Sequence, residues 1–118
     1  MEKPIAHFWE HRMADLKEAL EANHFEVFLA EDALDASRVV QEKIIPRTGA
    51  KSVSWGGSMT FIATGLYDVL KGDPHMEVLD TFDKSLTPEE SLALRRKSLL
   101  VDLFITGTNA VTETGELV

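Results

Sequence analysis

The stretch Lys51-Ser-Val-Ser-Trp-Gly-Gly-Ser-Met-Thr-Phe-Ile-Ala-Thr-Gly-Leu66 decides how this chain folds. Residues 52–55 are typical of a short β-strand, and Gly56 and Gly57 predict a turn directly after it. Ser58 and Thr60 then stand at the head of an apolar pattern with helical spacing. In such a strand–loop–helix unit, glycines let backbone N–H groups turn toward a ligand, and the start of a helix adds partial positive charge. The stretch therefore predicts an anion-binding turn.

Outward from this turn, helices and short strands alternate along the chain. The predicted strands cover residues 25–29, 52–55, 77–80 and 103–106. The predicted helices cover residues 4–23, residues 32–45 with Pro46–Gly49 ending that helix, residues 58–70 with an interruption at Gly65, and residues 87–99. The last helix has the clearest start, because Thr87, Pro88 and Glu90 provide an N-cap, a first-turn proline and a capping box. This alternation predicts an α/β fold with a mostly parallel sheet flanked by helices.

A length of 118 residues predicts a single domain, with an N-terminal helix over about residues 1–24 and an α/β core over residues 25–118. Near the end, Thr114 and Gly115 predict a turn, and residues 116–118 resemble the opening of a further strand. We therefore expect the natural protein to continue, with these residues as its N-terminal portion.

Composition argues against several classes of protein. The net charge of −8 disfavours nucleic-acid binding, which needs a basic face, and fits a cytoplasmic protein. Neither a secretory leader nor an apolar run long enough for membrane insertion is visible. The chain has no cysteine, which excludes a thiolate nucleophile and iron–sulfur ligation by these residues, so no cofactor is expected within the chain.

A second glycine loop, Gly107-Thr108-Asn109, follows the last predicted strand. Because ligands of parallel sheets bind beyond the carboxyl ends of the strands, we expect both loops to share one crevice. The predicted ligand-binding residues are Gly56, Gly57, Ser58, Met59, Thr60, Gly107, Thr108, Asn109 and Thr112. The alternative for Ser58 is an ordinary helix cap, and for Thr108 and Asn109 it is loop stabilisation. Trp55 is predicted to pack in the core.

Charged side chains provide weaker candidates. Arg95 and Arg96 are candidate contacts for an anion, with a solvated helix face as the alternative. Glu113 is the nearest carboxylate for a general base, although an exposed turn residue is the commoner outcome. His7 and His11 stand four residues apart without the accompanying ligands that a zinc site requires, so no metal site is predicted.

Three segments, in this order, resemble the lactate-utilisation (LUD) domain family: residues 55–60, residues 87–90 with Arg95 and Arg96, and residues 102–112 with 115–118. The resemblance covers most of the chain, and the family's domain is considerably longer. It implies a three-layer fold of the NagB/RpiA/CoA transferase-like type. It also implies a role in oxidising L-lactate to pyruvate beside iron–sulfur and oxidoreductase partner subunits, with clusters held by those partners or by a C-terminal portion.

The same fold includes ribose-5-phosphate isomerase, whose phosphate loop resembles residues 57–60. That enzyme carries acids where this chain has Gly107-Thr108-Asn109-Ala110. An amide has no useful basicity, so sugar-phosphate isomerisation is disfavoured. The resemblance implies a subunit or accessory protein that binds a small anionic or nucleotide-like ligand and can form a homo-oligomer. A stand-alone ligase or acyl-transfer enzyme and a non-catalytic regulatory module stay open as alternatives.

Overall fold

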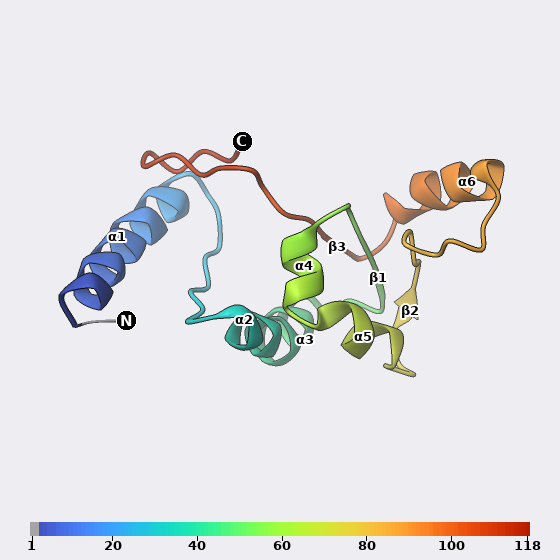
Figure 1. The fold of residues 1–118 in the computed structure, drawn as a ribbon, viewed down its shortest axis with the longest axis horizontal. Coiled ribbons are helices and arrows are strands. Elements are labelled where there is room, and N and C mark those ends of the chain that lie inside the picture. Colours follow the sequence, from blue (N-terminus) through green and yellow to red (C-terminus); the bar gives the residue numbers. More distant parts are fainter. Residues whose placement is uncertain (1–2) are drawn as a thin grey trace. The chain divides into compact units, whose positions relative to one another are not determined.

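Three parallel strands form the sheet of the computed structural model, which describes residues 3–118 (Figure 1). Their order is β2 (Glu77–Val78), β1 (Ser52–Trp55), β3 (Leu103–Ile105). In this register Val53 lies opposite Val78 on one side and Leu103 on the other. Val53, Ser54 and Trp55 are at most 1% exposed, because a central parallel strand is covered on both faces. The prediction of a helix-flanked parallel sheet is confirmed.

The buried core around β1 is completed by the two helices that follow this strand in sequence. Phe61 of α4 (Met59–Ala63) and two leucines of α5, Leu66 and Leu70 (α5: Leu66–Lys71), are buried against Val53 and Trp55. Gly65 separates these two helices with a left-handed backbone, φ +78°, as the predicted interruption requires. α6 (Pro88–Ser98) begins with the predicted capping box, in which Glu90 N–H donates to Thr87 Oγ1.

The helix before β1 runs further than its proline suggests. It consists of α2 (Ala33–Val39), a π-helical turn η1 (Val40–Ile44) and α3 (Ile45–Thr48), and it ends at Gly49 with φ +65°. Pro46 therefore lies inside the helix, and of the residues 46–49 that were predicted to end it, Gly49 does so. The Ile45 N–H donates to the Val40 carbonyl, five residues back. This wider turn provides the room that a proline ring needs inside a helix.

The described chain divides into two compact units. One unit combines the chain up to Ala30 with Thr108–Val118, and the other comprises Glu31–Gly107. The sheet and all helices except α1 belong to the second unit.

The first unit pairs helix α1 (Lys3–Ala22) with the end of the chain. Residues 109–118 fold back on themselves through an antiparallel bridge between Val111 and Leu117, with Gly115 in the turn. Gly115 has φ +85°, and a Cβ there would stand 2.7 Å from the Ala19 carbonyl, so only glycine fits this approach to the helix. Asn23 donates from Nδ2 to the Gly115 carbonyl at 2.8 Å.

The predicted strand at residues 25–29 is wrong, because the described residues 25–30 have no regular secondary structure. The reason lies at the end of α1. His24 adopts φ +70°, and the Phe25 N–H donates to the Leu20 carbonyl, which closes the helix with a Schellman turn. The first backbone donor of the expected strand is thus used by the helix.

Candidate functional site

The turn after β1 is built around a helix cap. Ser58 is extended, and its Oγ accepts a hydrogen bond from the Phe61 N–H at 3.1 Å. The cap uses the oxygen as an acceptor and leaves the hydroxyl proton free to donate. Gly57 has open space where a side chain would stand, so its backbone is not covered by a neighbour.

Gly107, the first residue of the second glycine loop, lies against the turn after β1 at the carboxyl edge of the sheet. Because β1 and β3 are parallel neighbours, both loops leave the sheet at the same edge, and the Gly56 N–H donates to the Ile105 carbonyl at 2.9 Å. A Cβ at Gly107 would stand 2.8 Å from Ser58 Oγ, and one at Gly56 would stand 2.9 Å from Thr106 Oγ1. Both glycines therefore permit a backbone approach that a side chain would block.

A groove of about 930 Å³ opens beside this turn, entirely within the second unit. It is lined by residues of the β1–α4 turn, of α4 and α5, of the segment after β2, and of α6: Gly57, Ser58, Met59, Ile62, Tyr67, Thr81, Phe82, Asp83, Lys84, Leu86, Pro88, Ser91 and Arg95. The volume lies within the range of clefts that hold organic ligands, about 300–1,000 Å³. The groove is the candidate functional site.

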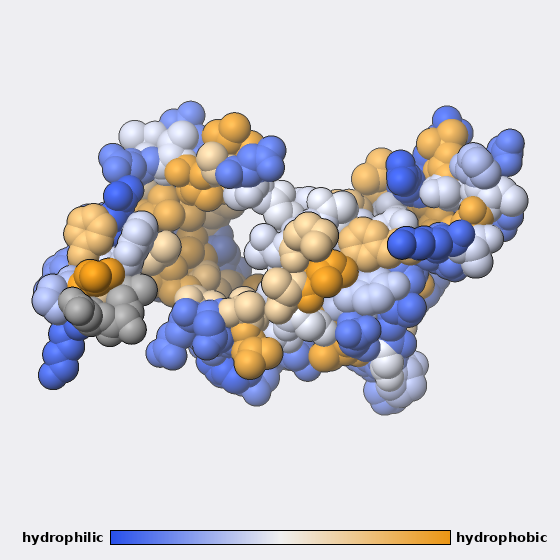
Figure 2. All heavy atoms as spheres, in the orientation of Figure 1, coloured by the Kyte–Doolittle hydropathy of each residue, from blue (hydrophilic) through white to orange (hydrophobic). Residues whose placement is uncertain are grey.

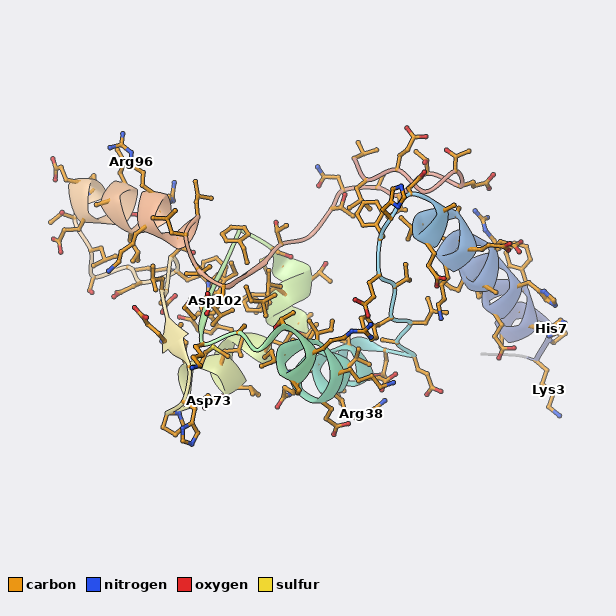
Figure 3. All side chains as sticks on the ribbon, turned by 180° about the vertical axis from the view of Figure 1, so that it is seen from behind. Lys3, His7, Arg38, Asp73, Arg96 and Asp102 are labelled. Atoms are coloured by element: carbon orange, nitrogen blue, oxygen red, sulfur yellow. The ribbon has the colours of Figure 1, made fainter. Side chains whose placement is uncertain are left out.

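Of the predicted site residues, Gly57, Ser58, Met59 and Arg95 line the groove together. Arg96 does not line it, and Figure 3 shows its side chain pointing away from the sheet. Gly56 lies in the turn but faces Thr106 and does not line the groove. Thr60 is exposed and lies outside the groove.

Two cations and one carboxylate line the groove. In residues 3–118, neither Lys84 nor Arg95 forms an ion pair. Asp83 accepts hydrogen bonds from Ser85 Oγ at 2.6 Å and from the Ser85 N–H at 2.9 Å. These bonds lower the pKa of the Asp83 carboxyl and favour its ionised form. The groove thus presents a small excess of unpaired positive charge in a chain whose net charge is −8.

One wall of the groove rests on a hydrogen-bonded cluster of three side chains. The Tyr67 hydroxyl donates to Asp80 Oδ2 at 2.7 Å, and Lys71 Nζ lies 3.2 Å from both oxygens. The bond to Asp80 and burial raise the pKa of Tyr67, and the bonds to Tyr67 and Asp80 raise the pKa of Lys71. The cluster joins α5 to the segment after β2, and it keeps the phenol protonated.

Trp55 lies in the core, as predicted, and does not line the groove. Its ring packs against Phe61, Tyr67 and Phe82, with centroid distances of 5.0, 5.3 and 6.0 Å. Within the described chain its buried Nε1 has no hydrogen-bond partner. Tyr67 and Phe82 therefore connect the groove directly to the centre of the core.

The remaining predicted residues belong to the first unit, where they organise the chain end. Thr108 Oγ1 donates to the Val118 carbonyl at 2.6 Å, as does the Asn109 N–H at 3.0 Å. Thr112 Oγ1 accepts from the Glu116 N–H at 3.0 Å. Glu113 is exposed and forms an ion pair with Arg12 at 3.0 Å. Their part in a ligand site shared with the groove stays a prediction.

Sequence reasoning missed the groove residues contributed by α5 and the segment after β2, chiefly Tyr67, Phe82 and Lys84. The sequence contained a signal for these residues. Residues 81–86 follow the strand β2, just as the glycine loops follow the strands β1 and β3. The rule that ligands bind beyond the carboxyl ends of parallel strands applies to all three strands.

His7 and His11 lie with their Nε2 atoms 3.1 Å apart on α1. Across residues 3–118, no group of three or more His, Asp or Glu side chains is placed to hold a metal ion. None of the described helices combines the length and apolar character needed to cross a membrane.

Comparison with known proteins identifies the family. The sequence model of the LUD domain matches residues 13–118, which include β1, the glycine loops and every residue that lines the groove. No curated protein and no solved structure matches the chain. A match over nearly the whole length is sufficient for assignment: the chain belongs to the LUD domain family.

Proposed function

We propose that this chain is a subunit or accessory protein of a cytoplasmic system that oxidises L-lactate to pyruvate, and that it binds a small anionic or nucleotide-like ligand at its glycine-rich loops. Membership of the LUD domain family supports the link to lactate utilisation. The observation that carries the binding proposal is that Gly57, Ser58 and the unpaired Arg95 line one groove at the carboxyl edge of the sheet.

Each of these residues has a distinct part in the proposed binding. The backbone at Gly57 is open to a ligand, the Ser58 hydroxyl retains a proton to donate, and the Arg95 guanidinium can grip a carboxylate or phosphate with two hydrogen bonds. The electrons of lactate oxidation would pass to iron–sulfur clusters held by oxidoreductase partner subunits or by a C-terminal portion of the protein, since these 118 residues contain no cysteine for a cluster.

The test is genetic. Deleting the gene in a host without a paralogue should abolish growth on L-lactate and lactate-dependent oxygen uptake, while growth on pyruvate continues. A plasmid with the wild-type gene should restore growth, and one with Arg95→Glu should not. The matched control is Arg96→Glu, which makes the same charge change on the same helix outside the groove. Normal growth of the deletion strain on L-lactate would contradict the proposed role.

A non-catalytic regulatory module is the second candidate, because of two residues in the first unit. The loop after β3 carries Asn109, an amide, and the carboxylate of Glu113 is paired with Arg12. The other alternative is a stand-alone ligase or acyl-transfer enzyme. A regulatory module binds its ligand without changing it, whereas a ligase or acyl-transfer enzyme consumes ATP or a thioester. Screening the purified protein for both activities decides between these alternatives.

A further inference from the structure

The groove is much larger than a lactate molecule. Lactate has about six non-hydrogen atoms and displaces no more than roughly six waters, or about 180 Å³ at ~30 Å³ per water. The groove of about 930 Å³ is several times larger. A three-carbon acid would therefore leave most of the groove to water, and it would gain little from the groove's apolar walls.

The groove also has an apolar side. Met59 is 82% exposed and Ile62 is 40% exposed, and both line the groove together with Phe82 and Leu86. Figure 2 shows apolar atoms gathered over α4, the helix that carries Met59 and Ile62. Leaving such side chains in water is unfavourable, and a ligand that covers them recovers roughly 25 cal/mol for each Å² of apolar surface removed from water.

The cationic side chains of the groove lie together with its apolar side chains. Lys84 and Arg95 come from two different segments, the one after β2 and helix α6, and both line the same groove as the apolar side chains. Neither cation has an ion-pair partner in residues 3–118, and the two outnumber the single carboxylate of the groove, Asp83, which accepts hydrogen bonds from Ser85. The groove therefore combines an unpaired cationic part with an apolar part.

We infer that the groove binds an amphipathic organic anion, and not lactate itself. The anionic group, a carboxylate or a phosphate, lies against Lys84 and Arg95, and an apolar body the size of a nucleobase or a medium acyl chain lies against Met59, Ile62 and Phe82. This inference rests on the proposed binding at the glycine-rich turn and names the class of ligand. Beyond the glycine-rich turn, it assigns contact with the anionic group to Lys84, and contact with the apolar body to Met59, Ile62 and Phe82.

Calorimetric titration of the full chain tests the inference with four probes: AMP, octanoate, inorganic phosphate and L-lactate. AMP and octanoate carry the two kinds of apolar body, whereas phosphate and lactate carry the charge without one. At least one of the first two should bind at least tenfold more tightly than both phosphate and lactate. Which of the two binds more tightly identifies the apolar body. The inference would be overturned if neither AMP nor octanoate binds. It would also be overturned if lactate or phosphate binds as tightly as AMP and octanoate do.

Substitutions then locate the site with the probe that binds best. Arg95→Ala and Lys84→Ala should each weaken binding by about ten- to a hundredfold, the cost of losing a charge-assisted hydrogen bond. Arg96→Ala, the neighbouring control outside the groove, should change the affinity by less than twofold. Met59→Ser removes an exposed apolar contact with little effect on folding, and it should weaken AMP or octanoate binding by about threefold or more without changing phosphate binding. Equal affinities for Arg95→Ala, Lys84→Ala and the wild type would place the probe elsewhere and overturn the inference.

The two proposals fail separately. Normal growth of the deletion strain on L-lactate would contradict the metabolic role, but it would not affect the inference about the ligand class of the groove. Loss of growth in that strain, together with tighter binding of lactate than of AMP and octanoate, would support the metabolic role and contradict the inference of an amphipathic ligand.

Discussion

Gly107 shows how a single residue fixes the geometry of the site. It lies so close to Ser58 that a Cβ would stand 2.8 Å from Oγ, the atom that caps α4. Neighbouring Gly57, by contrast, has open space at the same position. Two glycines in adjacent loops thus have different reasons to be glycine, and substitution can distinguish them.

We expect Gly107→Ala to destabilise the protein by about 1 kcal/mol, because Ser58 must move and the helix loses its N-cap bond. Gly57→Ala should stay within about 0.5 kcal/mol of the wild type. Urea unfolding of both variants provides the measurement, and Ser58→Ala provides a reference for the lost cap. An equal effect of the two glycine substitutions would contradict this account of the contact.

At the scale of elements, signals that are local in sequence predicted local structure well. The strand at residues 52–55, the break at Gly65 and the capping box at Thr87 all follow from residues within a few positions of each other. The prediction of a strand at residues 25–29 failed because a short apolar-rich segment does not reveal whether a partner strand exists. The π turn before Pro46 was not predicted, because it depends on how the helix packs, which the sequence does not state.

The cluster of Tyr67, Asp80 and Lys71 predicts how the link between α5 and the segment after β2 responds to pH. The folded protein holds the phenol as a donor to Asp80, so the pKa of Tyr67 is raised above its ordinary 10.0 and that of Lys71 above 10.5. Groups with raised pKa values stabilise the fold fully below their unfolded pKa and lose this contribution as the pH rises through the folded pKa. The cluster therefore contributes stability at neutral pH and loses it in alkaline solution.

Tyr67→Phe should accordingly be less stable than the wild type at neutral pH, and its free energy of unfolding should fall less between about pH 9 and pH 12. Urea unfolding across this range measures the effect. Tyr67 is the only tyrosine, so phenolate absorbance reports its titration directly in the folded protein. A phenol that titrates at its ordinary pKa would contradict the hydrogen bond to Asp80.

At the scale of the whole molecule, the sequence pointed to the edge of the sheet beside which the candidate groove opens, but not to all of the groove's walls. Parallel strands imply a shared carboxyl edge, which brought the loops after β1 and β3 together in the prediction. Tyr67 and Lys84 reach the groove only because α5 and the segment after β2 fold against β1. Contacts of this kind depend on tertiary packing, and a single sequence does not specify them.

The two compact units differ in how deeply their elements are buried, and this predicts a difference in hydrogen exchange. In the second unit the central strand β1 is at most 1% exposed over Val53–Trp55, whereas no residue of α1 from Lys3 to Ala22 is buried. Amides of β1 should therefore exchange most slowly, and those of α1 should exchange faster through local opening. Mass spectrometry of exchange in the full chain measures both, and equal protection of α1 and β1 would contradict this expectation.

The distribution of the two tryptophans gives each unit its own optical signal. Trp9 lies on α1 and is 44% exposed, whereas Trp55 is 1% exposed at the centre of the core. Trp55 should emit at shorter wavelength and resist a soluble quencher, and Trp9 should emit at longer wavelength and be quenched readily. A Trp9→Phe variant leaves Trp55 to report only on the sheet, and a Trp55→Phe variant leaves Trp9 to report only on the helix. Fluorescence can therefore follow the unfolding of each unit inside the intact chain.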